Sequence, residues 1–119
     1  MTFYTLEQLL LEYPGSEKSF PFDAITAVFK VRGKMFALAG IENDPVSVNL
    51  KCDPEDALIL RSQFPAIRPG YHMNKDHWNT IILNDSLELD LFKKLVSDSY
   101  ALVVSKLTKK VQTDLKNQT

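Results

Sequence analysis

The segment from Ile25 to Ala39 reads ITAVFKVRGKMFALA, with two runs rich in β-branched, aromatic and other apolar residues around a short polar centre. In the first run two sets of residues alternate: Ile25, Ala27, Phe29 and Val31 against Thr26, Val28, Lys30 and Arg32. A period of two is typical of a pleated strand. Arg32-Gly33-Lys34 is a tight-turn signal, so the segment predicts an antiparallel hairpin.

The sequence that follows this hairpin predicts a third strand. Asn43-Asp44-Pro45 supplies a turn, and the segment from Val46 to Leu50 alternates cleanly. Three consecutive strands with short links imply an antiparallel meander. On the N-terminal side of the hairpin, residues 16–23 are expected to form a connecting loop.

Two helices are predicted from their first and last residues. Thr5-Leu6-Glu7-Gln8 matches a capping box before an apolar stripe, and Pro14-Gly15 ends that helix. Asp53-Pro54 combines an N-cap residue with proline at the first helical position, and Pro65 ends the second helix. The first helix is short and is expected to pack through one apolar stripe.

The C-terminal half adds two strands and a third helix. Residues 66–73 are extended, and Pro69 confines them to a sheet edge or a loop. Residues 78–83 resume a strand pattern. Asp85 with Glu88 is expected to cap a helix with an apolar face that reaches about Leu107.

The element order α-β-β-β-α-β-β-α predicts an α+β fold, with helices packed on one side of an antiparallel β-sheet. The length of 119 residues fits a single domain over residues 1–119. Residues 108–119 are mostly polar, so we expect a loose C-terminal tail there.

Composition limits the classes of function. Hydrophobic residues make up 45% of the chain, which is typical of a folded globular domain. The formal net charge of −1 argues against strong, nonspecific binding to nucleic acid.

Cys52 is the single cysteine, so no internal disulfide is possible. The sequence lacks a secretory signal and a long apolar run, which predicts a cytoplasmic protein without membrane contact. A monomer is the favoured state.

The segment from Arg68 to Asn79 concentrates residues that stack on bases, contact phosphates or read base edges. They are Arg68, Tyr71, His72, Asn74, Lys75, His77, Trp78 and Asn79. A projecting hairpin that contacts nucleic acid or a protein is one interpretation. In the other, Tyr71 and Trp78 cap the core while Asn74 shapes a turn. Arg32 and Lys34 form a second basic tip, and the two tips together could straddle a duplex.

Metal and nucleophile chemistry are weaker interpretations of the same residues. His72 and His77, with Asp76, do not have the spacing of a zinc site. The carboxylates that might hold iron (Glu55, Asp56, Asp85, Glu88) are better explained as helix-capping residues. Cys52 precedes a helix, which would favour a thiolate, but a lone cysteine at a strand end is usually a small buried residue. No metal, cofactor or catalytic residue is therefore predicted.

Three stretches carry a resemblance to a known family. They are Val48–Leu58 (VNLKCDPEDAL), Phe64-Pro65, and Pro69–Thr80 (PGYHMNKDHWNT). The chain resembles the MmcQ/YjbR family of small bacterial proteins from its first helix to about Lys110. The resemblance implies a CyaY-like fold and DNA binding through a double-wing surface. It places the family motif on Pro69, Gly70, Tyr71, His72, Met73, Asn74, Lys75, His77, Trp78 and Asn79.

The leading hypothesis is a non-enzymatic, cytoplasmic bacterial protein that binds DNA weakly and in a salt-dependent manner through the Arg68–Asn79 segment. An alternative is a protein-interaction adaptor that uses the same surface or a sheet edge. The third is a small-molecule binder or enzyme with Cys52, His72 or His77 in its site.

Overall fold

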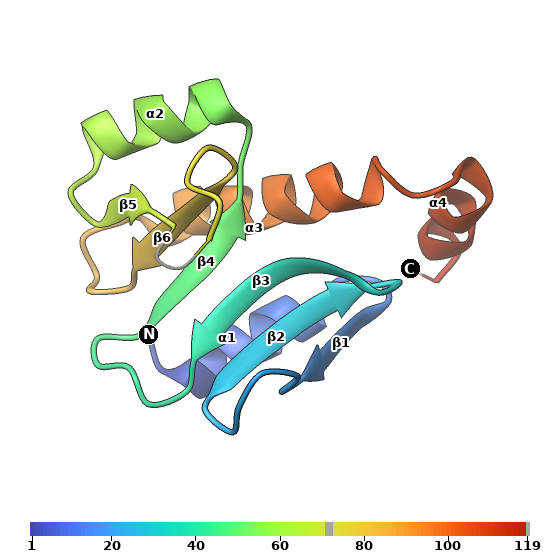
Figure 1. Cartoon of the computed structure of the whole chain (residues 1–119), viewed down its shortest axis with the longest axis horizontal. Coiled ribbons are helices and arrows are strands. Elements are labelled where there is room, and N and C mark those ends of the chain that lie inside the picture. The colour runs from blue at the N-terminus through green and yellow to red at the C-terminus, as the bar shows by residue number, and fades with distance from the viewer. Residues whose placement is uncertain (71–72, 119) are drawn as a thin grey trace.

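The computed structural model describes residues 1–70 and 73–118, and its core element is a six-stranded antiparallel sheet (Figure 1). The strand order is β1-β2-β3-β4-β6-β5. The strands are β1 (Ser16–Ser19), β2 (Thr26–Val31), β3 (Lys34–Gly40), β4 (Ser47–Lys51), β5 (Ile67–Pro69) and β6 (Trp78–Ile82). The helices are α1 (Phe3–Leu11), α2 (Pro54–Gln63), α3 (Leu89–Val104) and α4 (Lys109–Lys116). The predicted α+β class is confirmed.

The β2–β3 hairpin forms where the sequence predicts it. Val31 pairs with Lys34, and the two residues between them have positive φ angles, 49° at Arg32 and 80° at Gly33. Positive φ at both central positions is the geometry whose twist matches two-residue hairpins. Gly33 adopts it without steric cost, whereas Arg32 adopts it as an uncommon non-glycine case.

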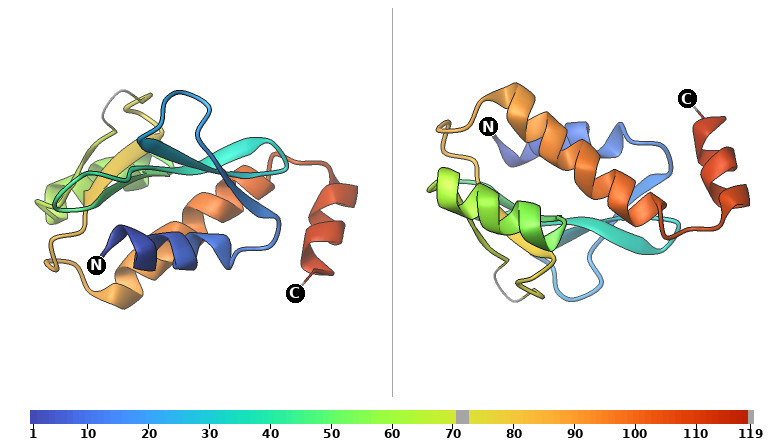
Figure 2. Two further views of the ribbon diagram at one scale, coloured as in Figure 1. Left: turned by 90° about the horizontal axis from the view of Figure 1, so that it is seen from below. Right: turned by 90° about the horizontal axis from the view of Figure 1, so that it is seen from above.

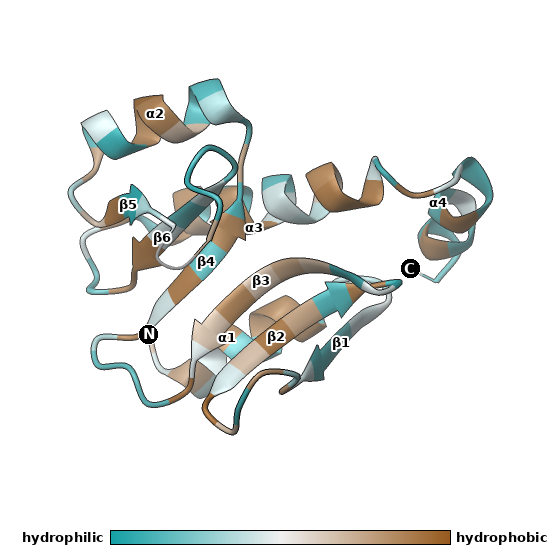
Figure 3. Ribbon diagram, in the orientation of Figure 1, coloured by the Kyte–Doolittle hydropathy of each residue, from teal (hydrophilic) through white to brown (hydrophobic). Residues whose placement is uncertain are grey.

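Helices α1 and α3 cover one face of the sheet, as Figure 2 shows. The buried core between them includes Phe29, Phe36, Leu50 and Val96, and the apolar colouring of β2, β3 and α3 in Figure 3 follows this packing. We call the opposite face of the sheet the open face. Its side chains include Asn49 and Thr80, whose hydroxyl donates to the Asn49 Oδ1 over 2.6 Å, as well as Leu38.

A buried serine joins α3 to the centre of the sheet. The Ser99 hydroxyl donates to the carbonyl of Phe36 over 2.6 Å and accepts from the Lys51 N–H over 2.8 Å. Both backbone groups lie just past the end of the β3–β4 ladder, whose last pair is Ala37 with Leu50. One fully buried hydroxyl thus satisfies two backbone groups that the β-ladder leaves over.

The N-terminal region differs from the prediction in two places. Residues 16–19, expected in a loop, form the edge strand β1, in which Ser16 pairs with Val31. Their all-polar sequence lacks any alternation, because only one side of the strand has a partner and neither face is deeply buried. Helix α1 begins at Phe3, with Thr2 rather than Thr5 as its N-cap.

The start of α3 also differs from the predicted capping box. Glu88 is the N-cap residue but makes no capping hydrogen bond through its side chain. Asp85 lies before the helix with a φ of 68°, so it belongs to a turn and not to the cap. The helix ends at Val104, three residues before the expected limit at Leu107.

The expected loose tail instead contains helix α4. Thr108 caps it, and its hydroxyl accepts from the Val111 N–H over 3.3 Å. Leu115 is only 2% exposed and belongs to the core cluster, close to Gly15 and Val31. The segment is polar overall, so its docking is shown by tertiary contacts, those of buried Leu115 and of Val111, which packs against the core.

No helix within residues 1–70 and 73–118 is long and apolar enough to cross a membrane.

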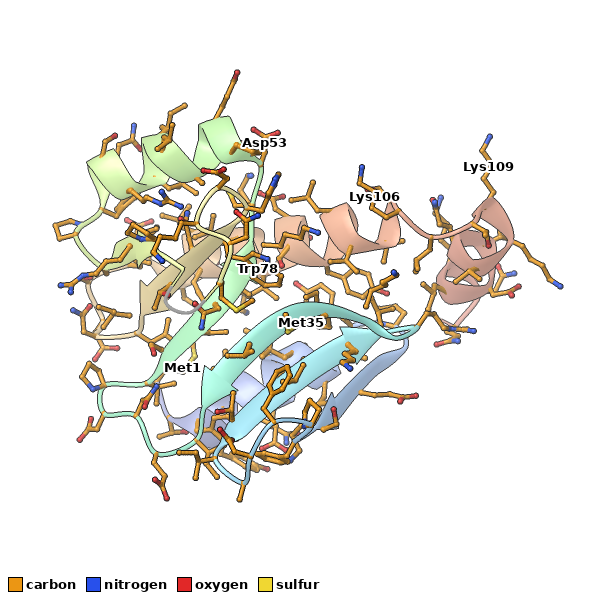
Figure 4. All side chains as sticks on the ribbon, viewed as in Figure 1. Met1, Met35, Asp53, Trp78, Lys106 and Lys109 are labelled. Carbon is orange, nitrogen blue, oxygen red and sulfur yellow. The ribbon has the colours of Figure 1, made fainter. Side chains whose placement is uncertain are left out.

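Replacing Leu115 with alanine tests the docking of α4. We expect Leu115→Ala to lower the free energy of unfolding by about 2–3 kcal/mol, because a buried leucine loses its apolar contacts. Urea denaturation followed by Trp78 fluorescence measures this. Lys109→Ala is the matched control, since Lys109 projects from the start of α4 (Figure 4), and it should change stability by less than about 0.5 kcal/mol. Equal stabilities of the two variants would mean that α4 is not docked.

Candidate nucleic-acid interface

Strand direction brings the candidate residues to one end of the sheet. Strands β2, β4 and β5 run the same way, because each is separated from the next by one antiparallel strand. The β2–β3 turn, the β4–α2 junction and the β5–β6 connection therefore leave from the same end, which we call the tip end (Figure 1). The two predicted basic tips thus lie on one side of the molecule.

Six of the predicted contact residues are exposed near the tip end: Arg32, Lys34, Arg68, Asn74, Lys75 and His77. The first two belong to the β2–β3 hairpin, and the others to β5 and the β5–β6 connection. In the strand order the two hairpins are three spacings apart, which is roughly 14 Å at about 4.8 Å each where the strands are paired. The exposed carboxylates of Asp53 and Asp76 lie at the same end and reduce its positive charge.

Backbone hydrogen bonds define the β5–β6 connection. The Gly70 N–H donates to the Trp78 carbonyl over 2.8 Å, and the His77 N–H donates to the Asn74 carbonyl over 3.2 Å. The Asn74 side chain also accepts from the Asp76 N–H over 2.9 Å, which is an Asx turn. The side chain of Asn74 is exposed, and it shapes the turn. This is the role predicted by the second interpretation of the segment, in which Asn74 is structural.

Gly70 is required by a close approach of backbone to side chain. A Cβ at this position would lie 2.8 Å from both the Cβ and the carbonyl oxygen of Trp78, and 3.1 Å from the Cβ of Met73. Those distances are too short for any residue but glycine without a backbone shift. Gly70 of the family motif therefore serves folding.

Arg61 is the residue that sequence reasoning missed. From α2 its guanidinium donates to the Asn79 Oδ1 over 2.6 Å, to the Trp78 carbonyl over 3.3 Å, and to the Lys75 carbonyl. The sequence shows only a basic residue in the last turn of a helix, where a favourable interaction with the helix dipole explains it. Its partners are 14 to 18 residues away, so no local pattern pairs them with it.

Two predicted contact residues are buried, which corrects their assignment. Trp78 is 8% exposed and Asn79 is 2% exposed. Trp78 shares a face with its cross-strand partner Lys51 and lies against Gly70, so it supports the loop and is not a free stacking surface. Asn79 pairs with Leu50 on the helix-covered face. The predicted contacts at Tyr71 and His72 lie outside the described residues.

Cys52 is half-buried at the junction of β4 and α2, and its N–H donates to the His77 carbonyl over 2.8 Å. Burial raises the pKa of its thiol, and the carboxylates of Asp56, Asp53 and Asp98 raise it further. A raised pKa means less thiolate at neutral pH, so these surroundings do not activate a nucleophile. Within residues 1–70 and 73–118, no group of three or more His, Cys, Asp or Glu side chains could hold a metal ion.

The sequence profile of the YjbR family matches residues 11–102. The chain belongs to the YjbR family. It is similar to the YbdF protein of Escherichia coli O157:H7, with 39% identity over 108 residues that cover 91% of this chain and 88% of the relative. The YjbR protein of Escherichia coli K12 is also 39% identical, over 90% of this chain and 91% of its own.

Solved structures of YjbR-like proteins share the fold. A Deinococcus radiodurans protein with a DUF419 domain superposes with a TM-score of 0.90 at 40% identity, covering 97% of this chain and 88% of its own. A Pseudomonas syringae protein gives a TM-score of 0.75 at 30% identity, over 87% of this chain and 99% of its own. The resemblance seen in the sequence is therefore confirmed at the level of family and fold.

Removal of Arg61 should destabilise this YjbR domain. We expect Arg61→Ala to lower the free energy of unfolding by about 2–3 kcal/mol, because three acceptors lose a charged donor. Arg68→Ala is the matched control: its Nε makes one long bond, 3.4 Å, to the Pro65 carbonyl, and should cost less than about 0.5 kcal/mol. Thermal or urea unfolding of both variants provides the comparison, and similar losses would contradict the anchoring role.

The raised pKa of Cys52 has a kinetic consequence. Because less thiolate is present at a given pH, alkylation by iodoacetamide at pH 7 should be slower than that of free cysteine and should accelerate as pH rises. Asp56→Asn should speed the reaction, since it removes a charge that raises the thiol pKa. Labelling as fast as that of free cysteine would instead indicate an activated thiol.

Proposed function

We propose that this YjbR-family protein is a non-enzymatic binding protein of the bacterial cytoplasm that contacts DNA weakly through its two basic tips. The observation that carries the proposal is the position of exposed Arg32 and Lys34 from one hairpin at the same end of the sheet as Lys75 and His77 from the other. Arginine, lysine and histidine side chains donate to phosphate oxygens without reading sequence.

The charge of the molecule supports weak and salt-sensitive binding. The chain has a net charge of −1, and Asp53 and Asp76 lie beside the basic tips. Few phosphates can be neutralised by such a surface, so the affinity should depend on a handful of cations. Sequence preference is not expected, because the buried side chains of Trp78 and Asn79 are not presented to base edges.

A protein partner on the open face is the second candidate. A groove of about 840 Å³ lies there, between the segment that carries Phe22 and Ile25 and the side that carries Arg68 and Met73. Phe22 is 70% exposed and Ile25 is 46% exposed. Large exposed apolar side chains beside a groove are a feature of protein-binding surfaces.

Substituting one lysine in each tip tests the DNA proposal. We expect Lys34→Ala with Lys75→Ala to weaken binding of a labelled duplex and to lower the slope of log K against log salt by about 1.8, at about 0.9 per phosphate contact. Fluorescence anisotropy from low to physiological salt measures both quantities. Lys93→Ala with Lys94→Ala is the control of equal charge, because both lysines are exposed on α3, on the helix-covered side.

The control pair distinguishes a local interface from net charge. An equal loss of affinity in both double variants would contradict the tip assignment, because the effect would then follow total charge. Absence of saturable binding at low salt would remove the DNA proposal and favour a protein partner at the groove beside Phe22.

A further inference from the structure

A second cavity lies on the helix-covered side, away from the open face. Its volume is about 600 Å³, and it lies between α2 and α3 over strands β4, β5 and β6. Its walls are mainly apolar and include Leu50, Ile59, Leu60, Ile81, Leu95 and Leu102. A mostly apolar cavity of this size with few polar groups is typical of a site for a small organic molecule.

One polar group in this cavity has no partner. Asn79 lines the cavity, and within residues 1–70 and 73–118 its buried Nδ2 has no hydrogen-bond acceptor. The amide orientation is determined by Arg61, whose Nε donates over 2.6 Å and so requires the oxygen of Asn79 on that side. The NH₂ group must then point elsewhere, and a buried donor without an acceptor costs free energy. A ligand acceptor would remove that cost.

The charges at the cavity wall largely offset one another. Asp53, Asp56 and Asp98 line it together with Lys51 and Lys94, and the Arg61 guanidinium is bonded to the Asn79 oxygen beside it. Lys94 is paired with Asp98 over 2.7 Å. The carboxylates of Asp53 and Asp56 then lie near the Arg61 cation, so the wall has no strong net charge of either sign and suits a neutral ligand oxygen.

We propose that this cavity binds a small neutral molecule with an apolar body and a carbonyl oxygen that accepts from the Asn79 Nδ2. The apolar body fills the space between α2 and α3, and the carbonyl satisfies the donor that the fold leaves unpaired. The site is separate from the basic tips and does not depend on DNA binding.

Acetophenone is a suitable probe, with α-methylstyrene as its isostere in which CH₂ replaces the carbonyl oxygen. Methyl NMR titration of the folded chain follows Leu50, Ile81 and Leu95, which line the cavity. We expect saturable shifts at these methyl groups and about tenfold tighter binding of acetophenone, because only the ketone accepts a hydrogen bond. Protection of Cys52 from alkylation gives a second readout, since Cys52 also lines the cavity.

Asn79→Asp removes the donor and keeps an oxygen for Arg61. It should abolish the preference for acetophenone over α-methylstyrene, with about a tenfold loss of acetophenone affinity. Ala101→Trp fills the cavity from an exposed position of α3 and should abolish binding of both probes. Lys93→Trp is its control on the same helix, exposed but outside the cavity lining, and should bind as the unmodified chain does.

Three results would overturn the proposal. They are equal affinity of the unmodified chain for the two probes, absence of shifts at the lining methyl groups up to the solubility limit of acetophenone, and unchanged binding in Ala101→Trp. Each of them can be obtained even if Asn79→Asp fails to fold.

Discussion

The guanidinium of Arg61 is the contact on which both candidate sites depend. It reaches from α2 across the end of β6 and satisfies two backbone carbonyls, those of Lys75 and Trp78, together with the side-chain oxygen of Asn79. The Lys75 carbonyl lies in an irregular connection without a ladder partner, whereas the Trp78 carbonyl already accepts from the Gly70 N–H. A planar group with several donors is suited to binding several acceptors at once. Without it, the β5–β6 connection would lose its attachment to the helix layer.

The alternation of β6 divides the family motif between the two faces of the sheet. Trp78 lies on the open face under the connection that displays Lys75 and His77, whereas Asn79 lies on the helix-covered face beside the apolar cavity. Adjacent residues of a strand point to opposite sides, so one short sequence supports a surface and a cavity at the same time. The residues of the motif from Pro69 to Asn79 are therefore explained more by their role in folding than by direct contact with a partner. Gly70 is the most constrained of them.

Topology, not total charge, makes the basic tips a surface. The net charge of the chain is −1, and no segment of it is strongly basic. Three strands that run in the same direction bring the β2–β3 turn and the β5–β6 connection to one end, so a few cations act together. Ser99 keeps this end aligned with α3, because its hydroxyl joins β3 and β4 to the helix layer.

The sequence by itself determined the elements whose signals are local. The Arg32-Gly33 turn, the Asp53-Pro54 helix start and the edge position of Pro69 follow from backbone preferences of single residues, and the structure has all three. The period-two alternation of the strands and the helical spacing of apolar residues then predicted the α+β class, because the buried face of each kind of element repeats at its own fixed spacing. The exposure of Arg32, Lys34, Asn74, Lys75 and His77 is also a local property, because these residues lie in or beside turns and connections.

Only the tertiary structure decided the features that depend on distant partners. Polar β1 is a strand because β2 lies beside it, and Leu115 docks α4 because Gly15 leaves space for it. The pairing of Arg61 with Asn79, and hence the unpaired donor in the cavity, joins residues 18 apart that no local pattern connects. Burial and hydrogen-bond partners are properties of the packed chain, so composition and periodicity do not contain them.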